Sequence, residues 1–302
     1  MPRIQTARAS HVSHAPTHPY RIVVASAGEP ASLGAIRVAL ALARRASASV
    51  HVVAVATPFL HVAAAAAAGD DMRRATVEAV GRQLATVAGT AHWEVDATVG
   101  MPADCIVDAA ESWPASLIIV GIGEHGAAAR LFGSETAVAI VKQSTIPVLA
   151  VPQDAHDLPT CAAAAIDFTE ASIDAATLAA TLLGPNGVLT LVHASMLIKS
   201  DPEPGSLPDV YTAGARDKLE ELCAQIHRDA QRQVRSLVVN GDIAKALLSF
   251  VERERCDLLA LGGHEQGLLD RVLFGSMRTT LLRRARCIVL VAPHPMAGAS
   301  PD

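Results

Sequence analysis

The hydrophobic pattern of this chain alternates between short, unbroken apolar runs and longer segments whose apolar residues recur at helical spacing. Unbroken apolar runs are typical of strands that are buried on both faces of a parallel sheet. In the first long segment Leu33, Ile36, Leu40 and Ala43 follow a 3-4-3 spacing, which predicts an amphipathic helix packed on that sheet. Strands and helices that alternate in this way predict an α/β protein.

The whole pattern occurs twice along the chain. Leu33 is matched by Ile173, 140 positions later, and the apolar run that begins at Leu117 is matched by the run at Leu258, 141 positions later. Each copy also closes with an apolar run followed by a proline. Because a repeat decides the architecture, we predict two tandem doubly wound domains, each a five-stranded parallel sheet with helices on both faces.

The repeat also sets the expected domain boundaries. We place the two domains at residues 20–153 and 158–295, with tails at 1–19 and 296–302 that lack periodicity and are expected to be disordered. The histidines of the first tail have no spacing that defines a metal geometry. Each copy is expected to keep its own sheet, so a single mixed sheet across the chain is not expected. Helical spacing within 213–238 predicts a long helix in the second copy.

Composition narrows the function classes. The net charge is −5 with both signs interspersed, which argues against nucleic-acid binding, since this needs a basic face. The most apolar stretch, residues 50–68, is interrupted by polar residues and a proline, so it is interpreted as a buried strand, a loop and a helix rather than a membrane span. No signal peptide is recognised at the start, and a cytoplasmic protein is expected.

The chain has five cysteines, an odd number, and no C-x-x-C pair. A disulfide framework or a zinc site would need tighter spacing, so we interpret them as small buried hydrophobic residues in a reducing compartment. The five are Cys105, Cys161, Cys223, Cys256 and Cys287.

Candidate binding residues follow the strands of the second copy. In a doubly wound sheet the ligand crevice lies beyond the carboxyl ends of the strands, where the strand order reverses. A glycine-rich turn and a helix start there would offer free N–H groups to a phosphate, and a carboxylate would accept hydrogen bonds from a base or ribose. The candidates are Asp167, Gly262, Gly263, His264, Gly267, Gly275, Ser276, Met277 and Arg278.

Each candidate also has an ordinary structural interpretation. The glycines are equally suited to turns, Ser276 to a helix N-cap, and Asp167 to capping the helix that follows it. His193 and His264 are more simply explained as core or loop histidines than as catalysts.

These residues resemble the universal stress protein family. Its sequences carry an aspartate after the first strand, a turn like those at residues 100–103 and 241–244, and a G-x-x-G segment followed nine residues later by G-S or G-T. The resemblance covers nearly the whole chain. It implies a stress-response protein and, in nucleotide-binding members, ATP or AMP in the crevice with phosphates on the glycine loop.

The first copy departs from that pattern at two places. Ala27 stands where the family has its aspartate, so a polar partner for adenine or ribose is absent. The loop from Gly121 to Gly133 is one residue shorter than the loop from Gly262 to Gly275. We therefore expect no ATP in the first copy.

In the second copy Glu265 occupies the second glycine position of the loop, and Glu124 has the matching place in the first copy. A carboxylate about 4 Å from a phosphate costs on the order of 4 kcal/mol at an effective dielectric of about 20. That is a large part of a micromolar affinity, which is about 8 kcal/mol. Arg271, Arg278 or a metal ion would offset the repulsion, and Gly267 would replace the missing backbone contact.

Two functions remain open. The sequence has no phosphate-binding P-loop, no nucleophile elbow and no paired metal ligands, so we expect no enzyme. In the first hypothesis the chain is a stress-response interaction protein that binds protein partners or itself and requires no cofactor. In the alternative, its second copy is an adenine-nucleotide sensor for ATP or AMP.

Overall fold

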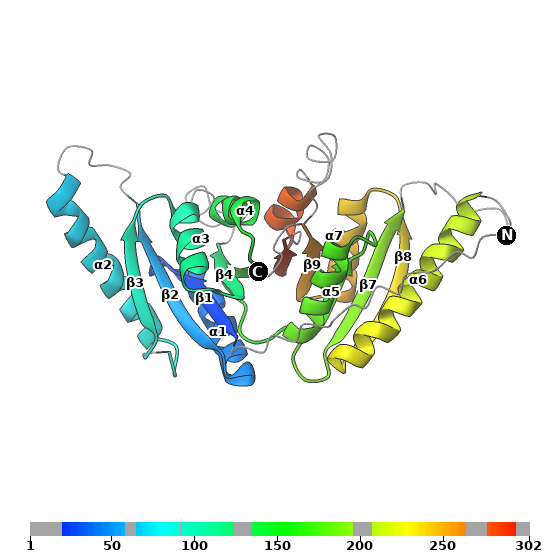
Figure 1. Cartoon of the computed structure of the whole chain (residues 1–302), viewed down its shortest axis with the longest axis horizontal. Helices are drawn as coiled ribbons and strands as arrows, with labels where there is room; N and C mark the ends of the chain where they lie inside the picture. The colour runs from blue at the N-terminus through cyan, green and yellow to red at the C-terminus, as the bar shows by residue number, and fades with distance from the viewer. Residues whose placement is uncertain are drawn as a thin grey trace, which may run out of the picture.

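The structure is a computed structural model that describes residues 20–57, 65–90, 92–123, 134–195, 207–263 and 277–293. The two terminal tails predicted from sequence lie outside this part of the chain. Figure 1 shows two similar α/β halves joined side by side.

The first half alternates strands and helices in the predicted order. Its elements are β1 (Arg21–Ala25), a short 3-10 turn (Pro30–Ser32), α1 (Leu33–Ala46), β2 (Ser49–Ala56), α2 (Ala65–Ala85), β3 (Glu94–Val99), α3 (Pro102–Ser112), β4 (Leu117–Ile122), α4 (Ser134–Gln143) and β5 (Val148–Pro152).

The second half repeats this order. Its elements are β6 (Cys161–Ala165), α5 (Glu170–Leu182), β7 (Val188–Ser195), α6 (Leu207–Ala230), β8 (Gln233–Asn240), α7 (Ile243–Glu254), β9 (Leu258–Gly262), a helix at residues 277–284 and β10 (Ile288–Ala292).

Within each half, all the strand pairs are parallel, and the strand order is that of a doubly wound sheet: β3-β2-β1-β4-β5 and β10-β9-β6-β7-β8. The predicted fold class is therefore confirmed, with five parallel strands in each copy.

The expectation of two separate sheets is wrong. The edge strands β5 and β10 pair antiparallel, with Leu149 opposite Leu290, so the described strands form one ten-stranded mixed sheet. Both strands are almost entirely apolar and buried, and an unpaired edge would leave their N–H and C=O groups without partners. The hydrophobic pattern of an edge strand that pairs across copies is the same as that of an internal strand, so no local pattern indicated the joint.

The helices cover both faces of this sheet. Alternate residues of β1 point to opposite faces: Ile22 and Val24 belong to the core covered by α1, α2, α5 and α6, whereas Val23 belongs to the core covered by α3, α4, α7 and the helix at 277–284. Each core runs across both copies, so the two halves share their hydrophobic interior. Among the described residues no helix is long and apolar enough to cross a membrane.

The long helix predicted within residues 213–238 is shorter than expected at its carboxyl end. α6 ends at Ala230, and Gln231 adopts a left-handed conformation with φ of 52°. The following residues then form β8 at the sheet edge. The helix therefore ends where the chain turns into this edge strand.

Candidate functional site

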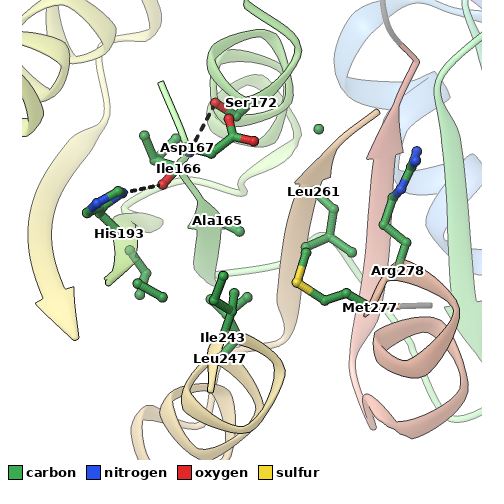
Figure 2. Close-up of a pocket in the computed structure, with 13 residues that line it drawn as sticks. Ala165, Ile166, Asp167, Ser172, His193, Ile243, Leu247, Leu261, Met277 and Arg278 are labelled. Atoms are coloured by element: carbon green, nitrogen blue, oxygen red, sulfur yellow. Dashed lines mark hydrogen bonds between the residues drawn. The ribbon is translucent and has the colours of Figure 1, made fainter. Parts of the chain in front are cut away.

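The candidate site of the second copy is a crevice at the carboxyl ends of β6, β7 and β9, closed from below by α7 and from the side by the helix at 277–284 (Figure 2). Its cavity volume is about 70 Å³. Asp167, Gly262, Met277 and Arg278 line it, as the sequence predicts for a common site. Ordinary small-molecule sites are larger, roughly 300–1,000 Å³.

Gly263, which was also predicted as a site residue, is used in the sheet instead. It directly follows β9, and its N–H donates to Ala292 O at 2.6 Å, which extends the pairing with β10. The remaining residues of the glycine loop lie outside the described residues: His264, Glu265, Gly267, Gly275 and Ser276.

Asp167 organises the start of α5. Its Oδ1 accepts hydrogen bonds from Thr169 N at 3.0 Å and from Thr169 Oγ1 at 2.5 Å. Thr169 is the N-cap of α5 and accepts a hydrogen bond from Ser172 N at 3.3 Å. The carboxylate is exposed on the rim of the crevice, so this capping role leaves it within reach of a ligand.

Gly262 has a packing reason to be glycine. A Cβ added there would lie 2.5 Å from Ser172 N and 2.7 Å from Ala171 C, where β9 meets the first turn of α5. Gly121 has the same place in the first copy, where a Cβ would overlap Ala31 O. Close approach of two backbones therefore explains this glycine in both copies, with or without a phosphate.

The floor of the crevice is apolar. Figure 2 shows the Met277 side chain reaching toward Leu261, with Ile243 and Leu247 of α7 below Ala165. The same view shows Arg278 on the far side of Leu261 from Asp167. The two charged residues of the predicted site thus stand on different sides of the cavity rather than together.

His193 is a core histidine, as its sequence position suggests. It is buried, and its Nδ1–H donates to Ile166 O at 2.8 Å. Its ring packs on Phe168 with 4.8 Å between centroids, and the ammonium of Lys218 on α6 lies 5.6 Å from the centroid of the Phe168 ring. Phe168 was not predicted as a site residue, yet it has a φ of 65° and turns the chain from Asp167 into α5.

The first copy has a related crevice of about 120 Å³, but its polar groups are used internally. Ser26 Oγ donates to Gln83 Oε1 at 2.7 Å, Ser32 Oγ lies 3.0 Å from the same oxygen, and all three side chains are buried. Gln83 Nε2 donates to Glu29 O at 2.5 Å. Ala27 stands where the second copy has Asp167, so α2 supplies the polar group that closes this site.

No sequence signal identified Gln83. It lies on α2, 57 positions from Ser26. Its polar side chain is buried, which its sequence position does not indicate. In the described residues no cluster of His, Cys, Asp and Glu could hold a metal ion.

The chain matches the model of the universal stress protein family twice, over residues 20–152 and 163–293. The two matches cover most of the chain, and each matched half is a doubly wound sheet with a crevice at the carboxyl ends of its strands. The chain therefore belongs to the universal stress protein family and carries two of its domains.

Individual relatives agree with this assignment. A universal stress protein from Methanocaldococcus jannaschii is 25% identical over 115 residues, which cover 34% of this chain and 65% of that protein, so the match spans just under two thirds of that relative's length. The crystal structure of a universal stress protein from Archaeoglobus fulgidus covers 92% of this chain and 98% of its own, at 18% identity and a TM-score of 0.69. A functionally unknown protein from Pseudomonas aeruginosa covers 90% of this chain and 92% of its own, at 12% identity and a TM-score of 0.58. At these identities the two structures support the fold.

Proposed function

We propose that this protein is a cytoplasmic, non-catalytic stress-response protein that acts through protein partners or self-association and requires no nucleotide. The observation that carries the proposal is the first-copy crevice, in which Ser26, Ser32 and Gln83 satisfy one another. A ligand would have to break these buried hydrogen bonds before it made its own, at a cost of about 1–3 kcal/mol for each group left unsatisfied.

The joint between the copies supports the same proposal. The antiparallel pairing of β5 with β10 and the shared cores make the chain a fused pseudo-dimer. Arg45 of α1 adds a polar contact across the joint, because its guanidinium donates to the carbonyl oxygens of Thr181, Leu182 and Leu183 at the end of α5. Two domains joined in this way suit a role as an interaction surface.

A second candidate function is supported by the second copy alone. Asp167, Gly262 and Arg278 line one crevice there, and the Asp167 carboxylate is exposed at its rim. In this alternative, ATP or AMP binds once per chain and changes the surface offered to partners. The described part of this crevice, about 70 Å³, is smaller than ordinary small-molecule sites.

One experiment separates the two functions. A strain that lacks this protein is complemented with the wild type, Asp167→Ala or Ala27→Asp, and survival under the inducing stress is measured. The interaction function predicts that all three complement equally, whereas the sensor function predicts that Asp167→Ala fails. Isothermal titration with ATP and with AMP, each with magnesium, accompanies it: two equivalent sites per chain would contradict both functions.

A further inference from the structure

Three of the five cysteines lie together at one end of the second half. Cys161 is the first residue of β6, Cys256 comes two residues before β9, and Cys287 directly precedes β10. Since β6, β9 and β10 are neighbouring parallel strands, their starts meet at the same edge of the sheet. This edge is opposite to the crevice, which lies at the carboxyl ends, so the cysteine cluster is independent of nucleotide binding.

Two of these thiols are in direct contact. The Sγ atoms of Cys161 and Cys256 are 3.1 Å apart, about 1 Å more than the S–S bond length of about 2.05 Å. The two residues are 95 positions apart in the sequence, and nothing in their spacing indicates this contact.

The backbone around the pair is held in place by Asp257. Its N–H donates to Cys161 O at 2.9 Å, and its carboxylate accepts hydrogen bonds from Cys161 N at 2.9 Å and from Thr160 N at 3.0 Å. The two thiols therefore lie in contact between backbone segments that hydrogen bonds hold together.

A cavity of about 510 Å³ lies next to the cluster. The linker between the two halves, residues 154–159, forms one wall, and the last turn of α7 and residues 284–288 form the others. Cys256 and Cys287 line this cavity, whereas Cys161, in contact with Cys256, is not among the lining residues and is itself partly exposed. Its volume is several times that of either crevice, and a molecule the size of a hydroperoxide fits easily.

We propose that Cys161 and Cys256 are an oxidation site, at which a hydroperoxide converts the two thiols into a reversible intrachain disulfide. This site joins the start of β6 to the turn before β9, at the point where the linker enters the second half.

The surroundings assign different roles to the two sulfurs. Burial, and then the neighbouring Cys161 thiol, raise the pKa of Cys256 far above the ordinary thiol value, so this sulfur stays protonated at neutral pH. Burial also raises the pKa of Cys287 to about 12. Cys161, the most exposed of the three, is the sulfur that meets the oxidant first.

The chemistry balances in two steps. The Cys161 thiolate attacks one oxygen of hydrogen peroxide, the O–O bond breaks, and the products are a sulfenic acid and hydroxide, which takes up a proton to become water. Cys256 then gives up its proton to the departing hydroxyl as its sulfur attacks the sulfenic sulfur, the S–O bond breaks, and a second water leaves. The two sulfurs lose two electrons in all, and the peroxide gains them. A dithiol reductant reverses the reaction by thiol–disulfide exchange.

The test uses the full chain, treated with increasing hydrogen peroxide, blocked with an alkylating reagent and mapped by peptide mass spectrometry. We expect a linked peptide pair containing Cys161 and Cys256, lighter by two hydrogen atoms than the separate thiols, which disappears after dithiothreitol. A bond between Cys256 and Cys287, a bond between two chains, or a sulfinic acid at Cys161 without a cross-link would overturn the proposal.

Thermal unfolding of the oxidised and reduced protein provides the second readout. A disulfide that closes a loop of about 95 residues should raise Tm by at least about 4 °C. Cys105→Ser and Cys223→Ser are matched controls, because burial also raises the pKa of both thiols and both lie outside the cluster. The rise should persist in both controls and vanish in Cys161→Ser. A rise that persists in Cys161→Ser, or none in the wild type, would contradict the assignment.

Discussion

The two crevices share the same backbone packing, here called the shared frame, but they differ in their polar side chains. Gly121 and Gly262 let β4 and β9 approach the starts of α1 and α5, and Ser32 and Ser172 are buried at the start of those helices. Beyond this frame the copies diverge: the first turns Gln83 inward, whereas the second places Asp167 on the rim. Features that both copies share are thus explained by packing, and the site chemistry lies in the positions where they differ.

The largest expected effect comes from the shared frame. Gly121→Ala and Gly262→Ala should each lower the free energy of unfolding by about 3 kcal/mol, because each new Cβ meets backbone rather than a flexible side chain. Chemical denaturation measures the loss. Gly81→Ala on α2 is the control: its Cβ meets nothing within 4 Å, so stability should rise by up to about 1 kcal/mol. A much smaller loss of stability in Gly262→Ala than in Gly121→Ala would show that the two glycines are not equivalent in packing.

The next effect tests the network that is present in the first copy alone. Gln83→Ala should cost about 2 kcal/mol of stability, because it leaves the hydroxyls of Ser26 and Ser32 buried without their shared acceptor. The neighbouring exposed position gives a control, Arg82→Ala, which should change stability by less than about 0.5 kcal/mol. Equal unfolding curves for the two variants would mean that the network contributes nothing.

The third prediction concerns the loop of the second copy. Glu265 lies outside the described residues, so this prediction rests on the sequence pattern. Glu265→Gly should raise ATP affinity at least tenfold, about 1.4 kcal/mol, by removing both a charge and a side chain beside the phosphates. Titration calorimetry measures it, Glu265→Gln separates charge from bulk, and adenosine should gain less than ATP. Unchanged ATP binding in both variants would show that Glu265 does not hinder nucleotide binding.

The smallest effect tests the joint between the copies. Arg45→Ala should cost about 1 kcal/mol, because the exposed guanidinium gives up its hydrogen bonds to the end of α5. Arg44→Ala is the matched control, since Arg44 donates to Ala88 O within its own copy. Hydrogen exchange should quicken at the last turn of α5 in Arg45→Ala alone. The same change in Arg44→Ala would show that the effect is not a contact across the joint.

The sequence predicted that four of the described candidate residues would lie near one another, but not what each of them contacts. Asp167, Gly262, Met277 and Arg278 come to one crevice because strand ends in a doubly wound sheet meet at one edge, which the repeat already implied. Their roles depended on neighbours from elsewhere in the chain. The packing of Gly262 on α5 and the separation of Arg278 from Asp167 follow from how the layers stack.

The sequence by itself determined the α/β class, the two copies and their five parallel strands, because apolar runs and helical spacing are local properties of the chain. The tertiary structure alone decided three things: the pairing of β5 with β10, the turning inward of Gln83, and the meeting of Cys161 with Cys256. Each joins residues more than 50 positions apart. Such contacts depend on which sheet edges and helix faces remain uncovered once the local elements have formed. The pattern of neighbouring residues in the sequence does not specify those edges and faces.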